Sequence, residues 1–103
     1  MLIYHIVLPE VWEAFDTDLY FAKSLETEGF IHCSYEDQLS GVMDRYYKDR
    51  TDLIVLGIET DELMSRVVPE PSTNNEIYPH IYGPINRKAI ATVTEWSLDR
   101  SRK

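Results

Sequence analysis

The sequence predicts an α+β fold: one domain with a curved, split and mixed β-sheet, two main helices and one short helix. The chain has 103 residues, the size of a single domain. Helical and extended patterns alternate in its first half and extended patterns dominate its second half, an order that favours α+β over a doubly wound parallel sheet. No repeat or linker interrupts it. We therefore expect one domain at residues 1–97 and a basic tail at residues 98–103, which hold three of the ten basic residues.

The first quarter of the chain contains two extended runs separated by short helical segments. L-I-Y-H-I-V-L at residues 2–8 is apolar and rich in β-branched residues, which is typical of a strand buried on both faces. Pro9 ends this run and suits the first turn of a short helix whose apolar stripe reaches Phe15. A helical turn that ends at Gly29 and a strand at residues 30–33 are expected to follow.

The best helical pattern of the chain begins after that strand. Ser34 is a suitable N-cap, and Asp37 follows it at the spacing of a capping box. The next apolar residues recur at the spacing of a helix that buries one face, and they are Leu39, Val42, Met43, Tyr46 and Tyr47. The pattern ends in the charged run at residues 48–52.

The centre of the chain returns to extended patterns. L-I-V-L-G-I at residues 53–58 predicts a second fully buried strand, after which Thr60 is expected to cap a brief helix. A shorter strand at residues 66–68 should end at the proline that follows it. P-E-P-S-T-N-N at residues 69–75 has the composition of a loop, with two prolines and four small polar residues.

The last two predicted strands lie at residues 80–82 and 89–96. The loop at residues 69–75 stands close before the strand that carries His80, and no apolar side chain anchors its second half. We expect this loop to be a mobile flap over a site at that strand, because such loops commonly close over a ligand and exclude water. An ordinary surface connection is the alternative.

Charge and composition limit the classes of partner. Ten basic and eighteen acidic residues give a net charge of −8, and the seven basic and seventeen acidic residues among the first 97 give −10. Such a surface repels phosphates, so we expect no nucleic-acid partner. The longest apolar runs fall far short of the ~20 residues that span a membrane. A single cysteine, Cys33, cannot form an internal disulfide, and with no signal-peptide pattern the expected location is cytoplasmic.

All three histidines of the chain, His5, His32 and His80, lie in or beside predicted strands. An imidazole in an apolar strand needs partners for both ring nitrogens or a cleft beside it. Because side chains alternate along a strand, His5 and His32 flank one pocket if their faces meet. We expect the three histidines to converge on one concave site as catalytic residues. Three core histidines with satisfied nitrogens are the alternative.

A metal site and a cysteine nucleophile are two other possible chemistries for the same region. The sequence contains no H-x-H or H-x-x-x-H pair, so no metal-ligand set is predicted and a zinc-assisted hydrolase is the least favoured reading. Cys33 stands next to His32, and a nearby imidazole can activate a thiol. A cysteine in an apolar strand is more often a small buried hydrophobe, and this interpretation is preferred.

Carboxylate, hydroxyl and phenol side chains complete the candidate site. Glu76 is the candidate catalytic acid, and Glu70 is a second carboxylate beside the same loop. The candidate ligand-binding residues combine hydroxyls, a carboxylate and rings that could stack on a flat ligand: Ser24, Ser34, Glu28, Tyr78 and Tyr82. Both serines also precede helical segments, so a capping role is the alternative for them.

Several strings of the sequence are specific to one family. They are I-Y-H-I at residues 3–6, E-G-F-I-H-C-S at residues 28–34 and P-H-I-Y-G-P-I at residues 79–85. With these strings the chain resembles the domain of unknown function family 952 from residue 2 to about residue 93. The family name brings no established reaction.

The chain also resembles, more distantly, the ADP-ribosyltransferase fold. That resemblance implies that His5 contacts the nicotinamide ribose, that residues 32–34 support the pocket, and that Tyr78 or Tyr82 stacks on nicotinamide. It further implies a late acidic residue that assists transfer, and Glu76 is the nearest match to that position.

The resemblance leads to an expected function. We expect a histidine-lined cleft that binds or cleaves NAD or a related nucleotide, with NAD as a substrate and no firmly implied cofactor. Since His80 stands where the transferase acid would lie, the sequence leaves open whether the chain is an enzyme. The alternative is a non-catalytic module that binds a small molecule or a protein. The oligomeric state is not predicted.

Overall fold

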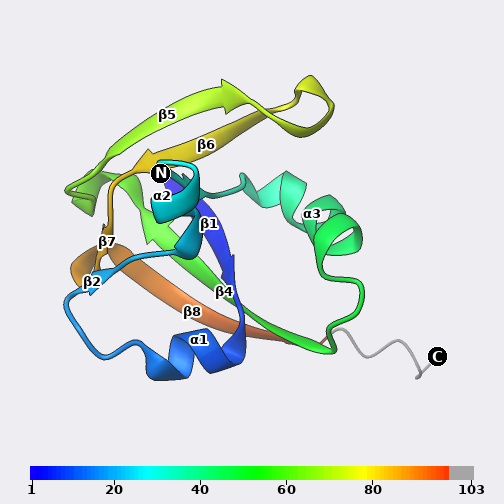
Figure 1. The fold of residues 1–103 in the computed structure, drawn as a ribbon, viewed down its shortest axis with the longest axis horizontal. Helices are drawn as coiled ribbons and strands as arrows, with labels where there is room; N and C mark the ends of the chain where they lie inside the picture. Colours follow the sequence, from blue (N-terminus) through cyan, green and yellow to red (C-terminus); the bar gives the residue numbers. More distant parts are fainter. Residues whose placement is uncertain (98–103) are drawn as a thin grey trace.

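The strands form three separate antiparallel sheets in the computed structural model, which describes residues 1–97 (Figure 1). The first sheet has the order β1 (Leu2–Val7), β4 (Asp52–Glu59), β8 (Ile90–Ser97). The second has the order β3 (Ile31–His32), β6 (Ile77–Tyr82), β5 (Arg66–Pro71). A small third sheet pairs β2 (Leu19–Tyr20) with β7 (Ile85–Asn86).

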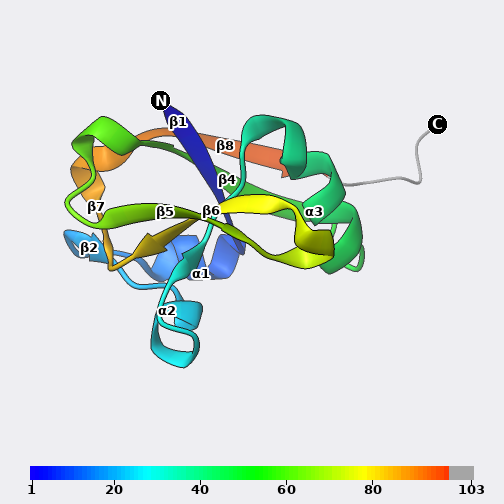
Figure 2. The same cartoon turned by 90° about the horizontal axis from the view of Figure 1, so that it is seen from above.

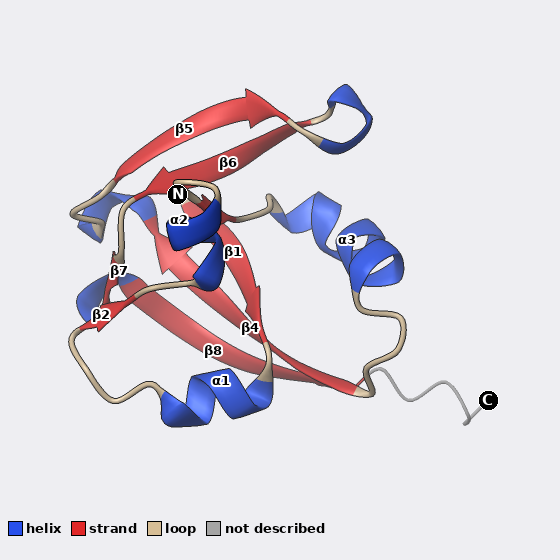
Figure 3. Ribbon diagram, viewed as in Figure 1, coloured by secondary structure: helices blue, strands red, loops and turns tan. Residues whose placement is uncertain are grey.

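Within residues 1–97, three α-helices lie between and beside the sheets (Figure 3). They are α1 (Pro9–Ala14), α2 (Lys23–Thr27) and α3 (Leu39–Tyr46), and four 3₁₀ turns accompany them: η1 (Glu36–Gln38), η2 (Thr60–Glu62), η3 (Thr73–Asn75) and η4 (Arg87–Ala89). The predicted α+β class, single domain and split sheet are confirmed. A mixed sheet was also predicted, but every strand pairing in the described part of the chain is antiparallel. The predicted basic tail at residues 98–103 lies outside the described residues.

Two apolar clusters hold these elements together. The larger joins the first two sheets through fully buried side chains such as Ile3 of β1, Ile31 of β3 and Ile81 of β6. The smaller packs Leu39 and Met43 of α3 against the other face of β1 and β4. Both faces of β1 and β4 are therefore covered, which is why their sequences read as continuous apolar runs rather than alternating ones.

The second sheet lies across one end of the first, and its hairpin of β5 and β6 reaches over to α3 (Figures 1 and 2). An isolated bridge connects the two sheets: the amide of Tyr4 donates to the carbonyl of Ser34 at 2.8 Å, and the amide of Ser34 donates back at 2.7 Å. At the far end the hydroxyl of Tyr46 hydrogen-bonds that of Thr73 at 2.7 Å.

Three predicted caps differ from the structure. The bridge with Tyr4 keeps Ser34 extended, so Ser34 is not an N-cap, and the amide of Tyr35 donates instead to the side chain of Gln38 at 2.9 Å. Ser24 lies inside α2 rather than before it, and its hydroxyl donates to the carbonyl of Phe30.

The brief helix expected at Thr60 is the 3₁₀ turn η2, whose N-cap is not Thr60. The N-cap of η2 is Glu59, and its carboxylate accepts a hydrogen bond from the amide of Asp61 at 3.2 Å. Thr60 instead donates its hydroxyl to the backbone carbonyl of Met1.

The loop predicted at residues 69–75 is wrong in its first half, where β5 continues through both prolines to Pro71. Pro69 lies opposite Pro79 in the register, and β5 is the outer strand of its sheet. Pro69 and Pro71 are two residues apart, so both ring nitrogens face the same side of the strand, and an edge strand has one side without a partner. Only the tip of the hairpin remains as the predicted loop.

None of the helices in the described residues is both long enough and apolar enough to cross a lipid bilayer.

Candidate functional site

Two adjoining hollows form one cleft between α2, α3, β3 and the hairpin tip. The larger has a volume of about 440 Å³ and the smaller about 190 Å³. Four residues line both: His32, Ser34, Val42 and Tyr47. We call this combined space the cleft. Its wall is contributed by segments that lie far apart in the sequence.

The smaller hollow contains His5, a buried residue on β1. Its Nδ1 lies 2.7 Å from the carbonyl oxygen of His32, and its Nε2 lies 3.0 Å from the hydroxyl of Tyr20. A carbonyl can only accept, so Nδ1 carries the proton and the Tyr20 hydroxyl donates to Nε2. Burial lowers the pKa of His5 to about 4, so this ring is neutral near pH 7. His5 therefore acts on the cleft by holding the backbone of His32.

His32 stands at the junction of the two hollows and pairs with a carboxylate of the cleft wall. Its Nε2 lies 3.0 Å from Oε1 of Glu28, and both side chains are about half exposed, at 49 and 50%. Glu28 follows α2 directly and Gly29, with a φ of 93°, turns the chain into β3, which brings both side chains to one edge. An imidazole paired with a carboxylate can take up or release a proton beside a bound molecule.

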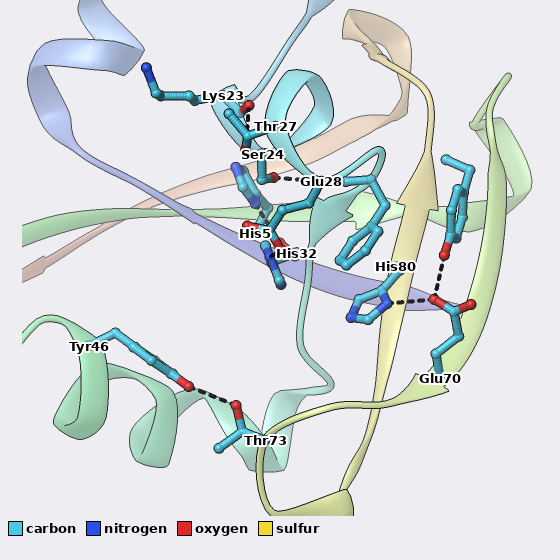
Figure 4. A network of polar contacts seen from close by, with 12 residues as sticks. His5, Lys23, Ser24, Thr27, Glu28, His32, Tyr46, Glu70, Thr73 and His80 are labelled. Carbon is cyan, nitrogen blue, oxygen red and sulfur yellow. Dashed lines mark hydrogen bonds and ion pairs between the residues drawn. The ribbon is translucent and has the colours of Figure 1, made fainter.

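His80 lies behind His32 and lines neither hollow. The two residues are directly opposite in the pairing of β3 with β6, and their ring centroids are 5.5 Å apart. Nδ1 of His80 donates to Oε1 of Glu70 at 2.7 Å, and Tyr82 donates to the same oxygen at 2.7 Å (Figure 4). These two hydrogen bonds hold the pKa of Glu70 below its usual range. Phe30 stacks on the His80 ring at 4.0 Å.

The other predicted site residues fall into two groups. Ser24 lines the smaller hollow and Tyr78 the larger one. Glu76 lies outside the cleft lining, but its carboxylate accepts the hydroxyl of Tyr78 at 3.1 Å. Tyr82 lies with Glu70 on the hairpin, away from the cleft. The structure thus brings His5, His32, Glu28, Ser24, Ser34 and Tyr78 together in the cleft lining, and it leaves His80, Glu76 and Tyr82 outside it. Their roles stay predictions.

Sequence reasoning missed several residues of this region. Tyr20, Tyr47 and Thr73 bond to or line the cleft, and Arg45 donates to the hydroxyl of Tyr78 at 2.7 Å. The sequence pattern predicts only that Tyr47 lies on the apolar face of a helix and that Thr73 lies in a loop. No local signal could have found Tyr20, because its partner His5 is 15 residues away and β2 has only two residues.

Cys33 is buried, and burial raises the pKa of its thiol well above the usual value, so the thiol stays protonated and unreactive near pH 7. The interpretation of Cys33 as a small buried hydrophobe fits this environment better than that of a nucleophile. Within residues 1–97, no three His, Cys, Asp or Glu side chains are grouped so that they could hold a metal ion.

Comparisons with known proteins give the fold and the family. Two crystal structures of protein CC0527 from Caulobacter crescentus, one of them a double mutant, superpose with a TM-score of 0.85 at 24 and 22% identity, over 97% of this chain and 90% of theirs. The solution NMR structure of CC0527 gives a TM-score of 0.81 at 24% identity, over 96% of this chain and 87% of that one. At this identity the likeness shows a shared fold alone. Curated proteins gave no match.

A family model, described as a protein of unknown function (DUF952), matches residues 6–93. This range contains the strings at residues 28–34 and 79–85 that suggested the family, and the last residue of the string at residues 3–6. It also contains most of the cleft lining, from Ile6 to Tyr78. The chain therefore belongs to the DUF952 family.

Proposed function

We propose that the cleft binds NAD or a related nucleotide through the end that carries its flat ring and ribose. The observation that carries this proposal is the make-up of the cleft, where four tyrosines, three serines and the Glu28–His32 pair line one continuous space. Rings can stack on a heteroaromatic base, and hydroxyls and carboxylates can bind ribose hydroxyls. The distant resemblance to ADP-ribosyltransferases names the same ligand.

The size and rim of the cleft support this choice. A hollow of about 440 Å³ with a side chamber of about 190 Å³ lies in the range of small-molecule sites and suits part of a dinucleotide. Although the body of the chain is strongly acidic, the guanidinium of Arg45 lies at the rim, where it donates to the hydroxyl of Tyr78. A phosphate that leaves the cleft on this side would lie near this guanidinium, which shares the Tyr78 hydroxyl with the carboxylate of Glu76.

Cleavage of bound NAD would need a group that stabilises positive charge on the ribose as nicotinamide departs. Glu28 is the carboxylate among the described cleft-lining residues, and its partner His32 is half exposed beside it. These two residues support the cleaving form of the proposal. The alternative, a non-catalytic binding module, is supported by His5, because both of its ring nitrogens are occupied by the protein.

The test measures NAD binding by isothermal titration calorimetry and nicotinamide release by chromatography. Val42 lines both hollows, so Val42→Trp should fill the cleft and weaken NAD binding at least tenfold. The control is Val93→Trp on the exposed strand β8, which should bind as the wild type does. Wild-type protein that does not bind NAD at about 1 mM would overturn the proposal.

A second pair of variants separates the two forms of the proposal. Glu28→Gln should abolish nicotinamide release and retain NAD binding, whereas Glu95→Gln on β8 should leave both unchanged. Binding without release in the wild type would assign the chain to the non-catalytic alternative.

A further inference from the structure

His80 contains an unsatisfied buried nitrogen that the cleft description does not use. The residue is 3% exposed, and its Nδ1 donates to the carboxylate of Glu70. Since a carboxylate only accepts, this bond places a proton on Nδ1, and when the ring carries no second proton its Nε2 has a free lone pair. Among the buried side-chain nitrogens and oxygens of the described residues, Nε2 of His80 is the one without a hydrogen-bond partner. Such atoms are rare because they lower stability.

The register of the second sheet explains how the ring is held. His80 lies opposite His32 on β3 and opposite Val68 on β5, so Glu70, two residues along β5, shares its face and reaches it diagonally. Phe30 covers the ring with an interplanar angle of 18°. Tyr82 donates to the same oxygen of Glu70 and so fixes the carboxylate. The imidazole is therefore oriented by Glu70 at its edge and by Phe30 on its face, as in sites where a carboxylate aims a histidine at a ligand.

The His32 ring separates this nitrogen from the cleft. Its side chain is half exposed, and its partner Glu28 is equally exposed, so the hydrogen bond between them holds the ring only weakly. His32 lines both hollows, and its ring meets that of His80 edge to face. In Figure 4 the free nitrogen of His80 points away from Glu70, toward the side on which His32 and Thr73 lie. Access from the cleft to Nε2 of His80 therefore requires the His32 side chain to rotate.

We infer that Nε2 of His80 is the hydrogen-bond acceptor of a buried subsite behind His32, which takes the N–H group of a carboxamide on a flat heteroaromatic ring. This inference rests on the proposed function, because the carboxamide of nicotinamide is the group it assigns to that subsite. Phe30 and His80 already stack at this point, so the surface that the ring would meet is planar and aromatic. His80 acts here as a residue that determines specificity.

The experiment uses two probes with the same pyridine ring, nicotinamide and methyl nicotinate, of which only the amide has N–H donors. Wild-type protein should bind nicotinamide about tenfold more tightly than the ester, measured by ligand-observed NMR titration. His80→Phe keeps a flat ring against Phe30 but removes the acceptor, so both probes should bind it equally. Ile77→Phe, on the opposite face of β6, is the control and should retain the preference.

A second measurement on the wild type covers the case in which His80→Phe does not fold. In ¹⁵N-labelled protein the Nε2 resonance of His80 should move upfield when nicotinamide is added and stay in place with methyl nicotinate, because only the amide can donate to it. An unchanged resonance at saturating nicotinamide, or equal affinity for the two probes, would overturn the inference.

The outcomes separate this inference from the proposed function. If NAD binds but the wild type does not distinguish the two probes, the subsite is wrong and the proposed function stands. If nicotinamide is preferred and shifts His80 but NAD does not bind, the subsite stands and the proposed function fails. If no probe binds, both are wrong.

Discussion

His5, His32 and His80 differ in how many ring nitrogens the protein occupies. Both nitrogens of His5 have protein partners, whereas Nε2 of His80 has none and is buried. His32 is half exposed and bonded to an exposed carboxylate. In the sequence the three histidines cannot be distinguished, because each lies in or beside a predicted apolar strand. The difference between a positioning histidine and one free to meet a ligand depends on Tyr20 and Glu70, which lie 15 and 10 residues away.

The first prediction concerns stability against pH. Burial lowers the pKa of His5 to about 4 in the folded state, while the unfolded chain keeps a value near 6.5. Between these values the unfolded state binds the proton more readily, so the free energy of unfolding should fall as pH is lowered from 6.5 toward 4. The full effect is about 3 kcal/mol. Urea denaturation at a series of pH values measures it.

His5→Gln is the control for this prediction, because it removes the titrating ring and should flatten the loss between pH 6.5 and 4. Hydrogen bonds hold the pKa values of Glu10, Glu59 and Glu70 below their usual range, so these carboxylates affect stability at lower pH, below about 4.5. An equal slope in wild type and variant above pH 4.5 would contradict the assignment to His5.

The second prediction concerns Tyr20, whose phenol hydroxyl donates a hydrogen bond to His5. Tyr20 is 4% exposed, and its hydroxyl is the donor to Nε2 of His5. Tyr20→Phe leaves that nitrogen buried without a partner and should lower the free energy of unfolding by about 1–3 kcal/mol. Tyr46→Phe removes an exposed hydroxyl that bonds Thr73 and should cost less than about 1 kcal/mol. Equal losses in the two variants, measured by urea denaturation at pH 7, would show that His5 does not depend on Tyr20.

At the scale of elements, the sequence predicted those that a local pattern specifies. The apolar runs of β1 and β4 and the helical spacing of α3 are properties of consecutive residues, and these elements are found within a few residues of their predicted bounds. β2 and β7 have two residues each and exist through pairing with one another, so no local pattern marks them. The predicted range of β5 is too short because prolines usually end a strand. An edge strand tolerates them, but the position of β5 at the edge of its sheet cannot be predicted from the sequence.

The third prediction concerns the tip of the β5–β6 hairpin. Asn74 has a φ of 58° in the 3₁₀ turn η3, a left-handed conformation that glycine and asparagine tolerate and other residues disfavour. Asn74→Ala should therefore lower the free energy of unfolding by about 1 kcal/mol. Asn74→Gly should change it by less than about 0.5 kcal/mol. Thermal and urea unfolding measure both variants, and an alanine variant as stable as the glycine variant would show that the tip adopts another backbone conformation in solution.

At the scale of the whole molecule, the cleft is a product of how the two larger sheets are joined. The predicted site residues on β1, β3 and α2 form one side of it. The opposite side comes from Val42, Tyr46 and Tyr47 of the α3 region and from the hairpin tip, and it depends on the hairpin reaching α3. The sequence could therefore indicate the histidine side of the site but not the wall that encloses it.

Polar contacts join the hairpin to the α3 side of the molecule. Gln38 donates to the carbonyl of Ile77, Arg45 donates to Tyr78, and Tyr46 bonds Thr73. Two of these bonds, Gln38 to Ile77 and Tyr46 to Thr73, are exposed and contribute about 0.5–1.5 kcal/mol each, so we expect that the hairpin tip can separate from α3 at modest cost. The flap stays a prediction, and it would include only the tip rather than all of residues 69–75, because β5 pairs with β6 as far as Pro71.

The last prediction tests this opening. The amide of Ser72 donates to the carbonyl of Glu76 across the tip, so its exchange with solvent reports on the motion there. Tyr46→Phe removes the contact with Thr73 and should speed this exchange about two- to tenfold, while the amide of Leu56 in the buried strand β4 should not change. Saturating NAD should slow exchange at Ser72 in the wild type, since a ligand in the cleft contacts both sides and holds the tip closed. Hydrogen exchange followed by NMR measures all three, and a Ser72 amide insensitive to both Tyr46→Phe and bound NAD would mean that the tip is a fixed part of the cleft wall rather than a flap.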